Sequence, residues 1–179
     1  MSIIDYDIFY RESLPVENNP INSTPFDIFI SAFNASDRVK EVFDKINSTQ
    51  KYWLIHPEYQ FSDEELTEVH ATSIIKPIEF GEQDQVSSLI SSINITDIEN
   101  TKICIDSTGC MRNVLSLLII TLGYLGCKKI SVLYSEPIQY IENENTHFSI
   151  SALKVKALDG TAITITTNAK DSLIMSIGF

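Results

Sequence analysis

Strand-like and helix-like segments alternate along this chain from residue 26 to residue 134. Each short apolar run is followed by a longer stretch whose apolar residues recur at helical spacing or that opens with a capping residue. A parallel pair of strands needs a crossover connection, and a helix usually provides it. The alternation therefore predicts a three-layer α/β domain, Rossmann-like or flavodoxin-like, with a mostly parallel sheet and helices on both faces.

The expected strands are short and apolar, in places nearly continuous, as is typical of strands covered on both faces. They are Phe26–Ser31, Tyr52–His56, Thr72–Ile78, Lys102–Ile105 and Lys129–Tyr134. The expected helices carry apolar residues three and four positions apart or begin with a capping residue. They are a helix through Val39 and Ile46 that Asn34 or Ser36 caps, a short one from Ser62 to Val69, one through Val86 and Ile93, and a long one from Met111 to Tyr124. Ser62-Asp-Glu-Glu65 fits a capping box at the start of the short helix.

The two ends of the chain depart from this alternation. Residues 1–25 are interpreted as an irregular arm and residues 26–179 as a single domain. Leu158-Asp-Gly160 has the composition of a hairpin turn, and strand-like runs flank it at 147–157 and 161–167, so a C-terminal antiparallel hairpin is expected. The chain ends inside one more apolar run, which favours the N-terminal part of a longer protein. The alternative is an end that is held in the sheet.

The charge balance narrows the range of partners. The formal net charge is −11, and a surface of this sign is unsuited to the phosphate backbone of duplex nucleic acid. No signal peptide opens the chain, and the longest apolar stretch is shorter than the roughly 20 residues that span a bilayer, so no membrane partner is expected. Cys104, Cys110 and Cys127 have no metal-binding spacing and fit the buried thiols of a cytoplasmic protein.

That longest apolar stretch, Val114–Leu125, is apolar nearly all round the helix it is expected to form. Such a helix is typical of the centre of a protein, and we interpret it as a central buried helix. The alternative is that part of it forms the face of a homodimer. A partner protein or domain is the other macromolecular partner expected of the chain.

The turn before this long helix has the composition of an anion site. Asp106-Ser-Thr-Gly-Cys-Met-Arg112 brings the hydroxyls of Ser107 and Thr108, the glycine Gly109 and the N–H groups of a helix start together with a guanidinium. Such groups bind phosphate or carboxylate oxygens. A cation is unfavourable at a helix N-terminus unless an anion or a facing carboxylate lies beside it. The alternative is that Ser107 or Thr108 is an ordinary N-cap and Arg112 a solvated residue.

Further polar residues follow other strands at the same expected edge of the sheet, among them His56 and Glu58 after the second strand. In open α/β sheets, ligands bind beyond the carboxyl ends of the strands. The alternative is that these residues are the polar turns in which any strand ends. The predicted ligand-binding residues are Ser31, Asn34, Asp106, Ser107, Thr108, Gly109, Arg112 and Glu136.

Catalytic residues are only weakly indicated. Glu136 could act as a general base, and His56 with Glu58 could form an acid–base pair, although a packed or solvated histidine is the simpler interpretation. The sequence contains no Gly-x-Ser-x-Gly elbow, Walker-type loop, His-Glu-x-x-His, Cys-x-x-Cys or Gly-x-Gly-x-x-Gly motif. We therefore expect neither a metal site nor a bound cofactor.

The Asp106–Arg112 turn, between a buried strand and an apolar helix, resembles the Thr-Gly-Gly-Thr-Lys type loop of CARF domains. CARF domains are Rossmann-like sensors of cyclic oligoadenylates in prokaryotic antiviral systems. The resemblance implies a nucleotide sensor in which Thr108, Gly109 and Arg112 hold the anion.

A second segment, Phe26-Asp-Ile-Phe-Ile-Ser-Ala-Phe-Asn-Ala-Ser-Asp37, resembles the first strand and loop of TIR domains, which bind partner proteins or cleave NAD. The Ser-x-x-Trp-Cys-x-x-Glu context of the TIR catalytic glutamate is absent from the sequence. The leading expectation is a sensor module for a phosphate-bearing small molecule of nucleotide type, in prokaryotic antiviral defence. The alternatives are a nucleotide- or NAD-processing hydrolase and a structural or assembly subunit without a ligand.

Overall fold

The computed structural model describes residues 25–34, 36–66, 69, 73–136 and 158. The expected N-terminal arm, C-terminal hairpin and last apolar strand lie outside the described residues, except for Pro25 and Leu158.

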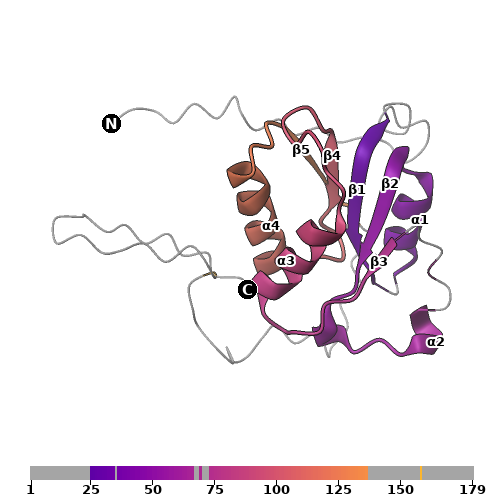
Figure 1. The fold of residues 1–179 in the computed structure, drawn as a ribbon. Helices are drawn as coiled ribbons and strands as arrows, with labels where there is room; N and C mark the ends of the chain where they lie inside the picture. Colours follow the sequence, from indigo (N-terminus) through magenta and orange to yellow (C-terminus); the bar gives the residue numbers. More distant parts are fainter. Residues whose placement is uncertain (1–24, 35, 67–68, 70–72, 137–157, 159–179) are drawn as a thin grey trace, which may run out of the picture.

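A five-stranded sheet forms the centre of the fold, and all of its strands run parallel (Figure 1). The strands are β1 Phe26–Ala32, β2 Ser48–Leu54, β3 Ser73–Ile75, β4 Ile103–Asp106 and β5 Ile130–Leu133. They lie in the order β3-β2-β1-β4-β5. The connections are α1 Asp37–Lys45, the 3₁₀ turn η3 Pro57–Tyr59 followed by α2 Asp63–Leu66, α3 Glu82–Ser92, and α4 Arg112–Tyr124. The predicted Rossmann-like α/β fold with a parallel sheet is confirmed.

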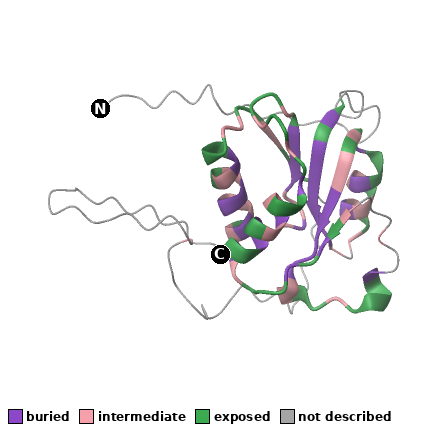
Figure 2. Ribbon diagram, viewed as in Figure 1, coloured by how far each residue is buried: buried purple, intermediate pink, exposed green. Residues whose placement is uncertain are grey.

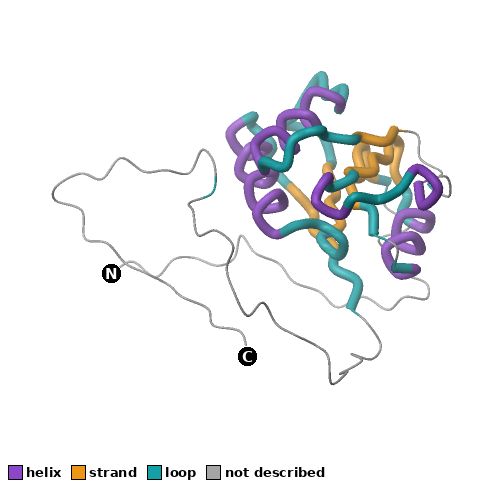
Figure 3. The backbone as a smooth tube through the Cα atoms, turned by 90° about the horizontal axis from the view of Figure 1, so that it is seen from below, coloured by secondary structure: helices purple, strands orange, loops and turns teal. Residues whose placement is uncertain are grey.

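Each face of the sheet has its own hydrophobic core. Side chains alternate along a strand, so Ile28 and Ile30 of β1 face α3 and α4, whereas Phe29 faces α1. Trp53 of β2 stacks on Phe43 of α1, with ring centroids 3.8 Å apart. Figure 3 shows helices on either side of the strands, and Figure 2 shows the buried residues concentrated in the sheet and on the inner sides of the helices. The three-layer arrangement follows from this double coverage.

The second strand differs from its prediction at both ends. The sequence places it at Tyr52–His56, whereas β2 spans Ser48–Leu54. Its first residues are polar, and pairing of Phe26 in β1 with Ser48 draws them into the sheet. The strand ends before His56, which instead precedes η3. Pairing with a neighbour, rather than hydrophobicity, sets these strand ends.

The interpretation of the long apolar helix as a central buried one is wrong. Only one side of α4 is buried, through Val114, Leu117, Leu118 and Leu122. Tyr124, at its end, is 87% exposed. The helix covers one face of the sheet beside α3, so its outer side faces away from the core (Figure 2). An outer layer of a three-layer fold has only one neighbour to pack against.

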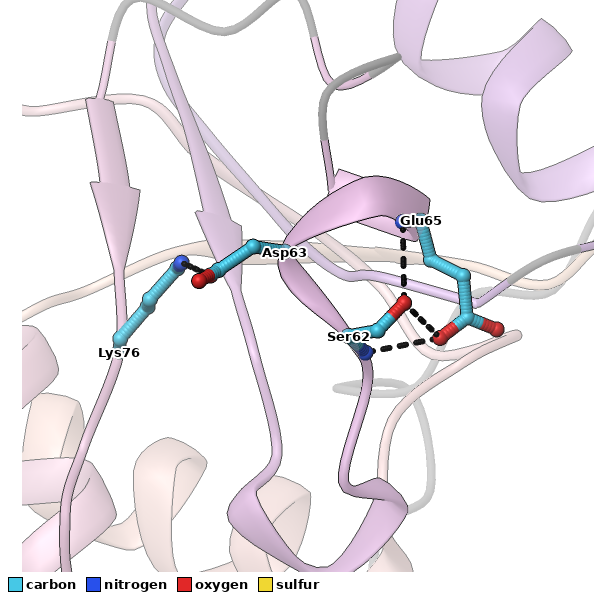
Figure 4. A network of polar contacts seen from close by, with 4 residues as sticks. All are labelled: Ser62, Asp63, Glu65 and Lys76. Carbon is cyan, nitrogen blue, oxygen red and sulfur yellow. Dashed lines mark hydrogen bonds and ion pairs between the residues drawn. The ribbon is translucent and has the colours of Figure 1, made fainter.

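The predicted capping box at the start of α2 is confirmed, and Figure 4 shows its reciprocal contacts. The Glu65 N–H donates to Ser62 Oγ at 3.3 Å, and the Ser62 N–H donates to Glu65 Oε2 at 2.8 Å. Two N–H groups without helical partners are thus satisfied by side chains. Nearby, Lys76 Nζ lies 3.4 Å from Asp63 Oδ1, whose side chain is 98% exposed.

Replacing Ser62 with alanine is expected to lower the free energy of unfolding by about 1 kcal/mol, because the cap of α2 is lost. Lys76→Ala is the matched control, and it should change stability by less than about 0.5 kcal/mol because its ion pair is exposed. Urea unfolding followed by circular dichroism measures both. Equal effects of the two variants would contradict the capping role of Ser62.

Candidate functional site

The direction of the strand order reverses between β1 and β4, which lie side by side at the centre of the sheet. The chain leaves β1 toward α1 on one face and leaves β4 toward α4 on the other. The loops after these two strands therefore diverge at the carboxyl edge of the sheet. In open α/β sheets this is the usual place for a ligand.

Gly109 brings the two loops into direct contact. A Cβ added to Gly109 would lie 2.4 Å from the carbonyl oxygen of Ala32 and 3.1 Å from Cβ of Asn34. No side chain fits between the loops at this point. Gly109 is therefore required for close packing of the loop after β4 on the loop after β1.

Two of the predicted ligand residues form a buried pair beneath this contact. Ser31 and Asp106 are direct neighbours on β1 and β4, and both are 0% exposed. Ser31 Oγ donates to Asp106 Oδ2 at 3.0 Å, and the Thr108 N–H donates to Asp106 Oδ1 at 2.9 Å. The two carboxylate oxygens of Asp106 therefore stabilise the conformation of the loop after β4. Both are hydrogen-bonded, as buried polar groups normally are.

The hydroxyls of Ser107 and Thr108 tie the same loop to the segment after β5. Ser107 donates to the Leu133 carbonyl from both its N–H, at 2.9 Å, and its Oγ, at 2.7 Å. The Ser135 N–H donates to Thr108 Oγ1 at 2.9 Å. Because Thr108 Oγ1 accepts this bond, its own hydroxyl hydrogen remains available as a donor to a ligand oxygen.

Arg38 is a residue of this edge that the sequence analysis missed. It lies in the first turn of α1, and its Nη1 donates to the Ser135 carbonyl at 2.8 Å. The guanidinium has five N–H donors, so this bond leaves others for a ligand. The sequence could have indicated Arg38, because this residue directly follows the loop after β1, which lies at the same edge of the sheet as Arg112.

Arg112 is the first residue of α4, and its side chain is exposed. The N-cap of α4 is Met111, which makes no side-chain capping bond, so neither Ser107 nor Thr108 is the N-cap. Within the described residues the Arg112 guanidinium makes no hydrogen bond or ion pair. A free cation therefore stands at the positive end of the helix dipole, where an anion would be favoured.

Asn34 and Glu136 lie at the margins of the site. Asn34 Oδ1 accepts the N–H of Ser36 at 2.9 Å, and Ser36 is the N-cap of α1. Glu136 is exposed and follows Ser135, whose N–H and carbonyl are both held. The structure thus places all eight predicted ligand residues at the carboxyl edge of the sheet, and three of them, Ser31, Asp106 and Gly109, are buried.

The predicted His56 and Glu58 pair is bridged by a residue of α3 that the sequence did not suggest. His56 Nδ1 lies 2.7 Å from Gln85 Oε1, and Gln85 Nε2 donates to Glu58 Oε1 at 2.8 Å. On its other side, His56 Nε2 accepts the Met111 N–H at 3.1 Å. His56 and Gln85 are both 0% exposed. Both ring nitrogens of His56 are therefore engaged in hydrogen bonds within the protein.

These contacts assign the tautomer of His56. Because Nε2 accepts a backbone N–H, the neutral ring carries its hydrogen on Nδ1, which donates to Gln85. The donors then run in one direction, from Met111 through His56 and Gln85 to the carboxylate of Glu58, an order in which each bond polarises the next. The second oxygen of that carboxylate, Oε2, is buried without a hydrogen-bond partner among the described residues.

Burial lowers the pKa of His56 below its usual 6.5, against smaller raising effects of the Gln85 hydrogen bond and the Glu58 charge. The unfolded chain therefore takes up a proton near pH 6.5 that the folded chain resists, and stability falls as the pH drops through this range. We expect His56→Gln, which does not titrate, to show a smaller loss of stability than the wild type between pH 8 and pH 5, roughly the window of histidine. Urea unfolding at several pH values measures the two slopes, and parallel slopes would contradict this role of His56.

Two cysteines near this edge, Cys104 and Cys110, have little nucleophilic character. Burial, and secondarily the charge of Asp106, raises the pKa of both Cys104 and Cys110 to about 12. A thiol with so high a pKa is protonated near neutral pH and is a poor nucleophile. Within the described part of the chain, no group of three or more His, Cys, Asp and Glu residues could hold a metal ion.

The comparisons add no relative. Neither a family model, a curated protein nor a solved structure matches the chain. The resemblances to CARF and TIR domains therefore rest on the sequence segments themselves. Among the described helices, none is both long and apolar enough to cross a membrane.

A hollow of about 300 Å³ lies at the opposite, amino edge of the sheet. Its lining includes Asp27 and Gln50, near the starts of β1 and β2, and Asp97 and Asn100 from the segment before β4. Several of these groups bond within the chain: Asp27 accepts the Lys102 N–H, and Asp97 accepts the Asn100 amide. The described residues that line the hollow include no arginine and no helix start, unlike those of the carboxyl edge.

Proposed function

We propose that this domain binds a phosphate-bearing small molecule, of nucleotide type, at the carboxyl edge of the sheet between the starts of α1 and α4. The observation that carries the proposal is the exposed Arg112 guanidinium, which has no partner within the described residues. A cation in the first turn of a helix is disfavoured by about 0.3–1 kcal/mol. A bound anion would turn this cost into a favourable interaction.

Two further groups support an anion of several oxygens. Arg38 adds a second guanidinium at the start of the other helix, fixed by its bond to Ser135. The Thr108 hydroxyl retains a hydrogen to donate. Guanidinium groups bind both carboxylates and phosphates through paired, charge-assisted hydrogen bonds. Two guanidinium groups and a hydroxyl supply more donors than one carboxylate can easily accept, which favours a phosphoryl group with its additional oxygens.

The buried base of the site favours binding over reaction. Asp106 is occupied by Ser31 and Thr108, and both nitrogens of His56 are engaged, so neither is free to move a proton to or from a ligand. We therefore favour a sensor module that passes its bound state to a partner protein or a further domain. The CARF-like turn makes prokaryotic antiviral defence the proposed setting.

A thermal-shift screen with mononucleotides, NAD, cyclic dinucleotides and cyclic oligoadenylates tests this proposal. A ligand at a hundred times its Kd adds about 2.7 kcal/mol, which raises Tm by about 5–10 °C in a chain of this size. A shift with one nucleotide class supports the sensor. No shift with any of them would contradict it, and turnover of NAD or ATP that Glu136→Gln abolishes would favour the hydrolase.

A further inference from the structure

The start of α4 is fixed by a hydrogen bond to a buried titratable side chain, the imidazole of His56. The Met111 N–H, at the N-cap of α4, donates to His56 Nε2. Arg112 is the next residue along the chain. His56 lies in the segment after β2. Within the part of the chain that the structure describes, it makes no hydrogen bond to Arg112. Among the described residues, the backbone bond that it accepts from Met111 is its one hydrogen bond to the anion site.

We infer that His56 is a positioning residue for the anion site: its neutral imidazole fixes the first turn of α4, and protonation releases that turn and weakens anion binding at Arg112. This inference rests on the proposed function. Its physical basis is that a protonated ring has only donors. Nε2–H would then face the Met111 N–H, and the 3.1 Å contact would change from attractive to repulsive.

The relay behind His56 makes this contact specific. The ring hydrogen on Nδ1 is held by Gln85, so the ring cannot turn to offer a different atom to Met111 without breaking its bonds to both Gln85 and Met111. The Gln85 amide is held in turn by Glu58 and by the Phe80 carbonyl, which fixes the acceptor that Nδ1 meets. All of these groups lie in or beside η3 and α3, so two elements fix the geometry of a third. Rigid support of this kind is what a binding site needs to keep its donors in register.

Other titratable groups lie around His56. Glu58 and Tyr59 belong to η3, and the Tyr59 ring stands edge-on to the His56 ring, with centroids 5.6 Å apart. Cys110 lies beside Tyr59, and Glu82 of α3 is 3.5 Å from the Asn113 amide. The raised pKa values of Tyr59 and Cys110 keep both neutral in the pH range of His56. Glu58, Glu82 and Arg112 are the other ionisable residues near this contact, and the variants below keep them unchanged.

Sulfate is the probe for the test, because it stays doubly charged throughout the pH range. We expect the wild-type sulfate Kd to rise about tenfold as the pH falls from 8 to 5, the loss of roughly one hydrogen bond. His56→Gln places an amide oxygen where Nε2 was and does not titrate, so its Kd should stay constant over the range. His56→Leu should bind weakly at every pH, and recovery by Gln relative to Leu identifies the acceptor.

A second measurement does not depend on any ligand. The amide signals of Met111 and Arg112 in ¹⁵N-resolved NMR spectra should shift with the protonation of the His56 ring in the wild type and stay constant in His56→Gln. Equal pH dependence of sulfate binding in the wild type and His56→Gln, or a Met111 amide that ignores the His56 proton, would overturn the inference. If neither sulfate nor any nucleotide bound at any pH, the proposed function and its dependence on pH would be refuted. A pH-dependent Met111 amide shift in the same experiment would still support the contact between His56 and α4.

Discussion

Replacing Arg112 with alanine is expected to weaken binding of sulfate and of any nucleotide ligand by about tenfold to a hundredfold. The loss corresponds to about 1.5–3 kcal/mol, the usual contribution of a hydrogen bond to a charged group. Because the side chain is exposed and makes no hydrogen bond or ion pair within the described residues, its removal should leave the free energy of unfolding nearly unchanged. Isothermal titration calorimetry with sulfate and urea unfolding measure the two effects.

Lys129→Ala is the matched control for this prediction. It removes one positive charge beside the start of β5, at the amino edge of the sheet, so it tests the effect of net charge alone. Arg112→Lys should recover part of the affinity, because a lysine keeps the charge but not the paired geometry. An equal loss in Arg112→Ala and Lys129→Ala would show that long-range charge, and not this position, governs anion binding.

Gly109→Ala is expected to be the most destabilising of the small substitutions considered, by about 2–3 kcal/mol, a range usual for an overpacked site. The added Cβ would lie 2.4 Å from a backbone oxygen of Ala32, so the loops after β1 and β4 would have to separate. The same separation would move Thr108 and Arg112, and ligand affinity should fall with stability. Urea unfolding and calorimetry report both.

Gly123→Ala is the control for the glycine substitution itself. Gly123 lies in α4, and an added Cβ meets no atom within 4 Å. Alanine there should stabilise the protein by up to about 1 kcal/mol through its higher helix propensity. If Gly109→Ala behaved like Gly123→Ala, the tight contact between the two loops would be refuted.

The alternation of apolar strands and helices was enough to predict the parallel α/β sheet of the described residues, whereas the predicted C-terminal hairpin lies outside them. Phe26–Ser31 lies within β1, and the periodic residues Val86 and Leu89 are buried on the inner side of α3. These signals are local, because each element buries a face that its own sequence defines. The capping box at Ser62 and Glu65 was predictable for the same reason.

The contacts that could not be predicted from the sequence depend on which helices and strands become neighbours in the fold. The order β3-β2-β1-β4-β5 brings Ser31 against Asp106, a pairing of residues 75 positions apart. Gln85, on α3, reaches His56 only because α3 packs beside the carboxyl end of β2. Neither contact leaves a motif in the sequence.

The long apolar helix was misinterpreted because composition does not report the number of layers. Ile120 and Tyr124 of α4 and its C-cap residue Leu125 are largely apolar yet exposed. A helix that looks buried on all sides by composition can still have a single neighbour, and its outer apolar residues are not evidence of a central position.

The most direct test of the account is an amide chemical-shift map of the ¹⁵N-labelled protein titrated with sulfate and with the nucleotide that gives the largest thermal shift. We expect changes that centre on Thr108, Gly109, Arg112 and Arg38, around the starts of α4 and α1. Changes centred on the amino-edge hollow, at Asp27, Gln50 and Asp97, or none with either probe, would contradict it.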